Sequence, residues 1–215
     1  MVTFNQVLAA TPGFPRDLTW DDYRNVEEPP LPFSALTGSR YTETHWAITS
    51  GTATGERRGS YFVDPLKVTV SFLSDQSWAR PSAKGDMRLL AHEQGHFDIT
   101  GLIARDLARR LLELRVYGPE LRDANDLRAA CRAVEQKMRR VRDRVDALWT
   151  ALQNGGESIY DTDTGHGTNE SGQREWSAML KHVKMHNLGL EDTLVSRGFV
   201  RLVSDPPTGR PIFGA

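Results

Sequence analysis

The chain has a single cysteine, Cys131, among its 215 residues. One cysteine cannot form an intramolecular disulfide, and it cannot build a zinc site from several thiolates. A metal site in this chain must therefore use histidine and carboxylate ligands. A chain of this length buries a substantial core without disulfides, so we expect one folded domain over residues 1–215.

Long apolar runs and an excess of charge of one sign are also missing. No stretch approaches the roughly 18 apolar residues that a membrane-spanning helix needs. Lysine and arginine number 27 and aspartate and glutamate 28, which gives a net charge of -1. Such a balance attracts neither nucleic acid nor an anionic membrane, so we expect neither as a partner.

The first ten residues lack the basic start and the uninterrupted apolar stretch of a secretory signal. The sequence as written therefore predicts a cytoplasmic protein. An exported protein whose leader has been removed is the alternative.

Residues 1–80 are expected to be mainly β and irregular. Five of the eleven prolines lie in the first forty residues, which disfavours long helices there. From 41 to 73, apolar and polar residues alternate. Thr44, Trp46 and Ile48 would share one face of a strand, and Val68 and Val70 one face of another. This period of two predicts an antiparallel meander with one face on the core.

Residues 84–190 are expected to be mainly helical, because apolar residues recur at helical spacing from Lys84 onward. Gly118-Pro119 is expected to end the first helix and start the second. A third helix is predicted from about Ser171 to Asn187.

The second helix carries an apolar seam whose spacing alternates between four and three: Leu127, Cys131, Val134, Met138, Val141, Val145, Leu148 and Leu152. This seam either packs along the preceding helix in an αα-hairpin or pairs with a second chain in a coiled coil. The hairpin is the simpler interpretation, because a tight turn joins the two helices.

His92-Glu93-Gln94-Gly95-His96 has the pattern H-E-x-x-H inside the first predicted helix. A spacing of four puts both imidazoles on one helix face, where His92 and His96 can reach a single Zn²⁺ ion. Glu93 is placed to act as general base toward a water activated by zinc. A solvated helix face is the alternative, but apolar neighbours such as Phe97 favour a shared metal that offsets the burial of the histidines.

A catalytic zinc site takes three protein ligands. His166, which lies between two glycines in a polar loop, is the favoured third ligand, and the other candidates are Glu170, Glu135 and Asp98. We expect the remaining histidines, His45, His182 and His186, to lie on the surface.

Two further roles are predicted in the loop that begins at Tyr160. The Tyr160 hydroxyl is a candidate donor to a developing oxyanion, and Asp161 or Asp163 could hydrogen-bond a ligand imidazole. A loop rich in turn-forming residues is the alternative explanation for each aspartate.

The segment Leu89–Ile99 resembles the helix motif of bacterial domain-of-unknown-function family 922, whose members are predicted zinc-dependent proteases. Similar segments lie upstream, in Leu18-Thr-Trp20-Asp-Asp-Tyr23 (with tyrosine where the family has phenylalanine), and downstream, in Tyr160-Asp161, Thr164, His166-Gly167, Gln173 and Trp176. The resemblance spans about residues 15–180. It implies a zinc-peptidase-like domain in which His166 completes the ligand set. Many members carry export signals, which this sequence lacks.

The expected fold is α+β and zincin-like: a small antiparallel sheet packed on an αα-hairpin that carries the H-E-x-x-H helix, plus a C-terminal helix. The expected function is that of a zinc metallopeptidase acting on a peptide or protein substrate, with an edge strand of the meander binding the extended peptide. The alternatives are a non-catalytic binding module stabilised by zinc and a metal-free protein that dimerises through the hairpin seam.

Overall fold

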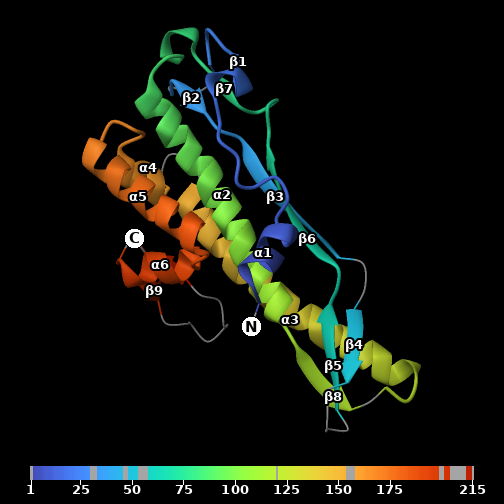
Figure 1. Cartoon of the computed structure of the whole chain (residues 1–215). Helices are drawn as coiled ribbons and strands as arrows, with labels where there is room; N and C mark the ends of the chain where they lie inside the picture. Colours follow the sequence, from blue (N-terminus) through green and yellow to red (C-terminus); the bar gives the residue numbers. More distant parts are fainter. Residues whose placement is uncertain are drawn as a thin grey trace.

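The computed structural model describes residues 2–29, 33–45, 48–52, 58–119, 121–153, 158–198, 201–203 and 212–214. These contain six α-helices and several small sheets, which confirms the α+β class (Figure 1). The helices are α1 (Phe4–Ala10), α2 (Met87–Glu113), α3 (Ala124–Gln153), α4 (Ile159–Thr164), α5 (Glu170–His186) and α6 (Leu190–Ser196). Within the described ranges, no helix has the length and apolar character needed to cross a membrane.

The strands are mostly short and lie mainly before α2. They are β1 (Arg24–Asn25), β2 (Ala35–Leu36), β3 (Ser39–His45), β4 (Ile48–Thr52), β5 (Arg58–Val63), β6 (Leu66–Phe72), β7 (Trp78–Ala79), β8 (Val116–Pro119), β9 (Arg201–Val203) and β10 (Ile212–Gly214). They form sheets in the orders β1-β7-β2, β3-β6, β4-β5-β8 and β10-β9.

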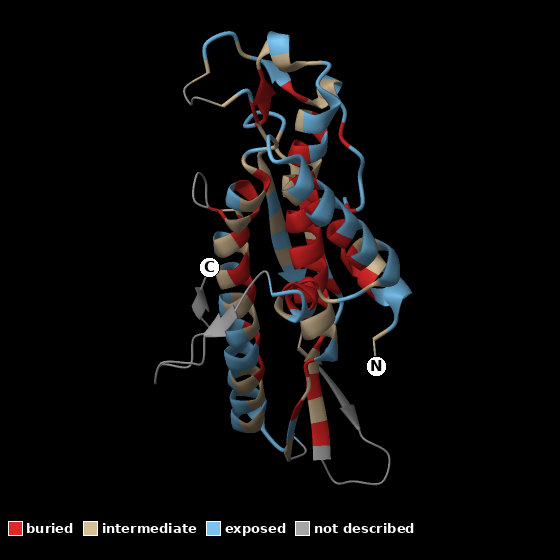
Figure 2. Cartoon of the chain, turned by 90° about the vertical axis from the view of Figure 1, so that its left-hand side faces the viewer, coloured by how far each residue is buried: buried red, intermediate tan, exposed pale blue. Residues whose placement is uncertain are grey.

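Helix α2 is the central element of the fold. It begins where the Asp86 side chain accepts hydrogen bonds from the backbone N–H groups of Arg88 and Leu89. One side of α2 contacts α1, β3 and β6, and the other contacts α3, α5 and α6 (Figure 1). Every residue from Phe97 to Ala108 is buried, which Figure 2 shows as an almost continuous stretch of red. A helix that is buried all round must be covered on all sides, and these elements cover it.

The predicted meander is wrong, because strands 39–72 form one long hairpin. β3 pairs with β6 from Ser39↔Phe72 to His45↔Leu66. β4 pairs with β5 in the same register, from Ile48↔Val63 to Thr52↔Gly59. Alternation of side chains identifies the buried face, here Val68 and Val70, but does not identify the partner strand. Trp46 lies outside the described residues.

The prediction that Gly118-Pro119 joins two helices is also wrong. α2 ends at Glu113, and residues 116–119 form β8, which pairs with β5. β8 is an outer strand, where a proline without an N–H group is tolerated. Pairing with a distant strand overrides the local preference of Gly-Pro for a turn.

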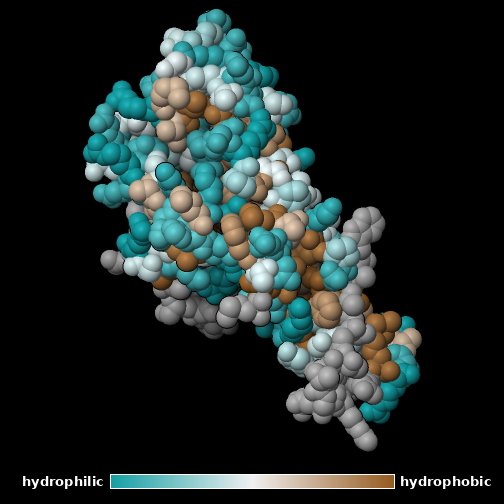
Figure 3. Space-filling model, in the orientation of Figure 1, coloured by the Kyte–Doolittle hydropathy of each residue, from teal (hydrophilic) through white to brown (hydrophobic). Residues whose placement is uncertain are grey.

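The seam of α3 packs against α2 as predicted for a hairpin. Five of its side chains are buried in the same apolar core as α2: Val134, Met138, Val145, Leu148 and Leu152. At the start of the helix, Leu127 is 45% exposed. Figure 3 shows apolar side chains on the surface at the end of the molecule where α3 begins. The third predicted helix, 171–187, is confirmed as α5, whereas α1, α4 and α6 were not predicted.

Candidate metal centre

Three ligand atoms from α2 and α4 converge on one point. His92 Nε2 lies 3.2 Å and His96 Nε2 3.1 Å from Asp161 Oδ1, and the two nitrogens are 3.3 Å apart. Around a tetrahedral zinc ion with bonds near 2.0–2.1 Å, neighbouring ligand atoms are about 3.3 Å apart. The triangle therefore has the size of one face of a zinc coordination tetrahedron, and these three residues could hold a metal ion.

Two glutamine side chains fix the orientation of the two imidazoles. His92 Nδ1 lies 3.2 Å from Gln173 Oε1, and the amide nitrogen of Gln173 donates to the Tyr160 hydroxyl at 3.0 Å. His96 Nδ1 lies 2.8 Å from Gln153 Oε1, and the amide nitrogen of Gln153 donates to the His96 carbonyl at 2.6 Å. In both cases the amide oxygen must face the ring, so each ring donates from Nδ1 and turns the lone pair of Nε2 toward Asp161.

A hydrogen bond also fixes the orientation of Asp161, the third residue of the triangle. Asp161 Oδ2 accepts a hydrogen bond of 2.7 Å from Ser158, which caps the start of α4. Its other oxygen, Oδ1, is thereby left for the two histidines. Three acceptor atoms facing one another are stable only when a positive charge lies among them.

The electrostatics of these groups agree with that requirement. Burial alone would lower the pKa of His96, but the hydrogen bond with Asp161 and the charge of Glu93 outweigh burial and raise it. Burial alone would raise the pKa of Asp161, yet its contacts with His92 and His96 hold that pKa well below its usual range. A proton on His96 and a metal ion therefore compete for the same place.

Tyr160 lies behind His92 and not in the cavity. It is fully buried, its ring stacks on the His92 ring with centroids 4.9 Å apart, and its hydroxyl donates to the His92 carbonyl at 3.0 Å. Gly95 makes room for it, because a Cβ there would lie 2.0 Å from the Tyr160 hydroxyl oxygen. Burial raises the pKa of Tyr160, so the hydroxyl stays protonated. These contacts make Tyr160 a support for His92.

A cavity of about 610 Å³ opens beside the three ligand atoms. Its walls are formed by the first turns of α2, residues 33–37 around β2, and the loop 165–168. Glu93 lines it, is only 3% exposed, and has an Oε2 atom without a hydrogen-bond partner among the described residues. A buried carboxylate oxygen requires a donor, and the described residues supply none to this atom.

His166 lies next to the triangle and also lines the cavity. Its Nδ1 is 3.5 Å from Asp161 Oδ1, and its side chain is 45% exposed. The structure thus brings together His92, His96 and Asp161, with His166 at their edge. The other candidate ligands lie elsewhere: Glu170 pairs with Arg88, Asp98 pairs with Lys184, and Glu135 is exposed.

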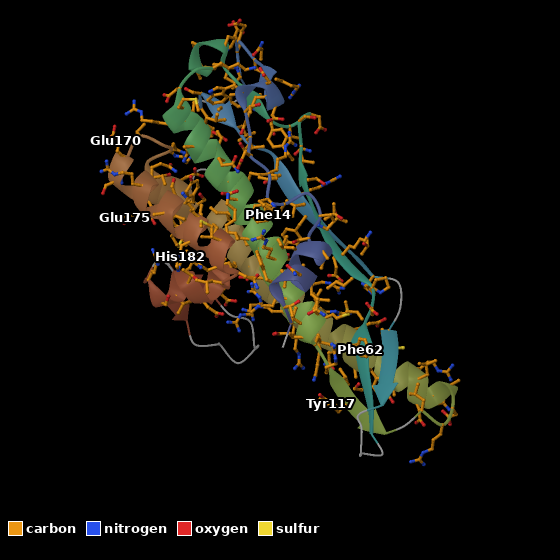
Figure 4. All side chains as sticks on the ribbon, in the orientation of Figure 1. Phe14, Phe62, Tyr117, Glu170, Glu175 and His182 are labelled. Carbon is orange, nitrogen blue, oxygen red and sulfur yellow. The ribbon has the colours of Figure 1, made fainter. Side chains whose placement is uncertain are left out.

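His45, His182 and His186 are exposed, as predicted, and Figure 4 shows His182 on the outer side of α5. Sequence reasoning considered Asp161 only as a partner for a ligand imidazole, and it missed Gln153 and Ser158. The signal for Asp161 was its place in the same short segment as His166. Gln153 has no sequence signal, because α3 brings it to His96 only through tertiary packing.

No protein-family model, curated protein or solved structure matches this chain.

Proposed function

We propose that this chain is a zincin-like zinc metallopeptidase in which His92, His96 and Asp161 hold the metal and Glu93 is the general base. The observation that carries the proposal is the triangle of three acceptor atoms beside a buried, unpaired carboxylate in an open cavity. When bound, a zinc ion supplies the positive charge that polarises a carbonyl group and lowers the pKa of a water toward 7.

The chain's own residues then have distinct tasks. Glu93 takes a proton from the water as the water oxygen bonds to the carbonyl carbon. It returns that proton to the amide nitrogen as the carbon–nitrogen bond breaks, so Glu93 ends as it began. Gln173 and Gln153 keep the two imidazoles in the orientation that binds metal.

Two histidines and one carboxylate also bind Fe²⁺ in oxygenases, so the ligand set alone does not select the chemistry. Glu93 favours hydrolysis, because a carboxylate beside the ligand triangle provides a base for water.

A peptide substrate is supported by strand β2. β2 is an outer strand of the sheet β1-β7-β2, and residues 33–37 line the cavity. The N–H of Arg80 donates to the carbonyl of Ser34 at 2.9 Å, so in this antiparallel register the N–H and C=O of Ala35 point away from β7. An extended peptide could pair with them as an added strand. β2, and not the 39–72 hairpin of the predicted meander, lies beside the metal centre.

Replacement of the base tests the proposal. The Glu93→Gln variant should retain zinc and lose hydrolysis of casein and of a peptide library by at least about 100-fold. Glu113→Gln, an exposed glutamate at the end of the same helix, is the matched control and should keep full activity. Unchanged hydrolysis by Glu93→Gln would contradict the mechanism. A wild-type protein without hydrolysis that unfolds on chelation would instead support the zinc-stabilised binding module.

A further inference from the structure

We infer that His166 is a catalytic residue that donates a hydrogen bond to the carbonyl oxygen of the substrate, and that it is not a metal ligand. This inference rests on the proposed function and adds the group that stabilises the oxyanion. It replaces the two sequence-based expectations that His166 binds the metal and that Tyr160 serves the oxyanion.

The backbone holds His166 in place. α4 ends at Thr164 and is capped by Gly165, and the N–H of His166 donates to the carbonyl of Asp161 at 3.0 Å. Gly165, His166 and Gly167 all have left-handed φ angles, 54°, 52° and 84°. A non-glycine residue adopts such a backbone only when its surroundings enforce it, and functional sites are where such residues gather.

The loop is packed against the metal-binding helix. A Cβ at Gly167 would lie 3.1 Å from the Cβ of His92, so a larger residue there would press on the ligand helix. The ring of His166 lies against that of Phe33, with centroids 5.2 Å apart. The imidazole, which lines the cavity, therefore lies between the Phe33 ring and Asp161, with its Nδ1 3.5 Å from Asp161 Oδ1.

The His166 imidazole is available for a substrate. Its Nδ1 lies 3.5 Å from Asp161 Oδ1, longer than a normal hydrogen bond, and His166 is not part of the group whose ligand atoms all lie within 4.8 Å of one another. Two other side chains with donors at the cavity have partners: Arg88 pairs with Glu170 at 2.6 Å, and the Thr168 hydroxyl donates to the Gly165 carbonyl at 2.5 Å. The Tyr160 hydroxyl is behind His92 and bonded to its carbonyl.

A donor at this place would add to the charge stabilisation that a bound zinc ion supplies. As the water oxygen bonds to the carbonyl carbon and its proton moves to Glu93, the π electrons of the carbonyl move onto its oxygen. A neutral imidazole keeps one N–H and can donate it to that oxygen without giving up the proton. Three protein ligands leave a coordination position for water, whereas a fourth ligand from His166 would close it.

The test compares the zinc-loaded wild type with the variants His166→Ala and His166→Gln. For each protein it measures the zinc content, the rate of peptide hydrolysis and the affinity for a fixed set of phosphinate pseudo-tripeptides. These phosphinates mimic the tetrahedral intermediate. His166→Ala should keep one zinc per chain, keep its KM, and lose about 100-fold in kcat and in phosphinate affinity. His166→Gln, which retains an N–H donor, should recover part of both. His182→Ala, an exposed histidine on α5, is the control and should match the wild type.

Loss of zinc from a folded His166→Ala protein would overturn the inference by making His166 a ligand. A His166→Ala protein that retains zinc and binds the phosphinates as tightly as the wild type would also overturn the inference, because His166 would then have no role in catalysis. If the wild type hydrolyses no peptide, the proposed function fails, and the phosphinate affinities still decide the role of His166. A wild type that also binds no phosphinate overturns both.

Discussion

Gly95 of α2 shows how the packing around the candidate metal centre constrains a single residue. Its missing side chain lets Tyr160 lie flat on His92, with the Tyr160 hydroxyl where a Cβ would otherwise be. A glycine in a helix interior normally costs up to about 1 kcal/mol relative to alanine. In α2 that cost accompanies a close approach that orients His92, a proposed metal ligand.

We predict that Gly95→Ala destabilises the protein although alanine is the better helix former. The added Cβ overlaps the Tyr160 hydroxyl, and overpacking of this kind costs about 1–3 kcal/mol. Urea unfolding of the two proteins measures the difference. A variant as stable as the wild type or more stable would show that Tyr160 does not occupy this space.

Gln153 provides the second prediction at this scale. Gln153→Ala removes the acceptor for His96 Nδ1, so the imidazole loses its fixed orientation and zinc affinity should fall about 10–100-fold. Competition with a fluorescent zinc chelator measures it. Thr150→Ala, an exposed residue on α3, is the control and should leave zinc affinity unchanged. Equal affinities for wild type and Gln153→Ala would exclude this role.

These residues also show how far a sequence can predict the site. His92 and His96 were predictable, because a spacing of four within one helix fixes their proximity. Asp161 was not, because it meets them only when α4 packs beside α2, far along the chain. Gln153 and Gln173, which orient the two imidazoles, likewise reach them only through tertiary packing.

At the scale of elements, the apolar seam of α3 distinguishes the hairpin from the coiled coil. Met138 is fully buried within the chain's own core, whereas Leu127, on the same seam, is 45% exposed. Most of the seam is therefore covered within the chain, because α3 packs against α2 and against strands β5 and β8.

We predict that Met138→Ala lowers the free energy of unfolding by about 2–5 kcal/mol, because it leaves a cavity in the core. Leu127→Ala, the matched control, should change it by only about 0.5 kcal/mol. Denaturant unfolding measures both. Equal small effects, or a Met138→Ala protein whose only change is the loss of a dimer, would favour the coiled coil.

Helices were easier to predict than strand pairing for a physical reason. The period of α3 and α5 is contained within each segment, so their positions follow from nearby residues. The pairing of β3 with β6 and of β8 with β5 is set by contacts between distant residues. The alternating pattern therefore identified strands 39–72 but predicted the wrong partners.

At the scale of the molecule, a buried charged network connects α6 to the two long helices. Glu191, at the start of α6, pairs with Arg110 of α2 and Arg144 of α3, each at 2.6 Å. Asp106 accepts the backbone N–H of Glu191 at 3.2 Å and pairs with Arg109. Burial raises the pKa of Asp106 to about 6, although Arg109 opposes the rise.

The raised pKa of Asp106 determines how the stability of the protein changes with pH. Because the folded-state pKa of Asp106 is above its unfolded value of 3.8, the folded protein binds the proton more tightly. Asp106 therefore contributes most to stability below pH 4, and this contribution decreases as the pH rises to about 6. We predict that the difference in free energy of unfolding between the wild type and Asp106→Asn, measured by denaturant unfolding, falls as the pH rises from about 4 to about 6. A difference that is constant or rises with pH would show that the arginines dominate.

The central claim is that His92, His96 and Asp161 hold the metal, and the zinc content of purified variants tests it most directly. Wild type and Asp163→Ala, which changes a neighbouring carboxylate of α4, should each carry one zinc per chain, whereas folded Asp161→Ala should carry almost none. A wild-type protein without zinc, or an Asp161→Ala protein that retains a full equivalent, would contradict the claim.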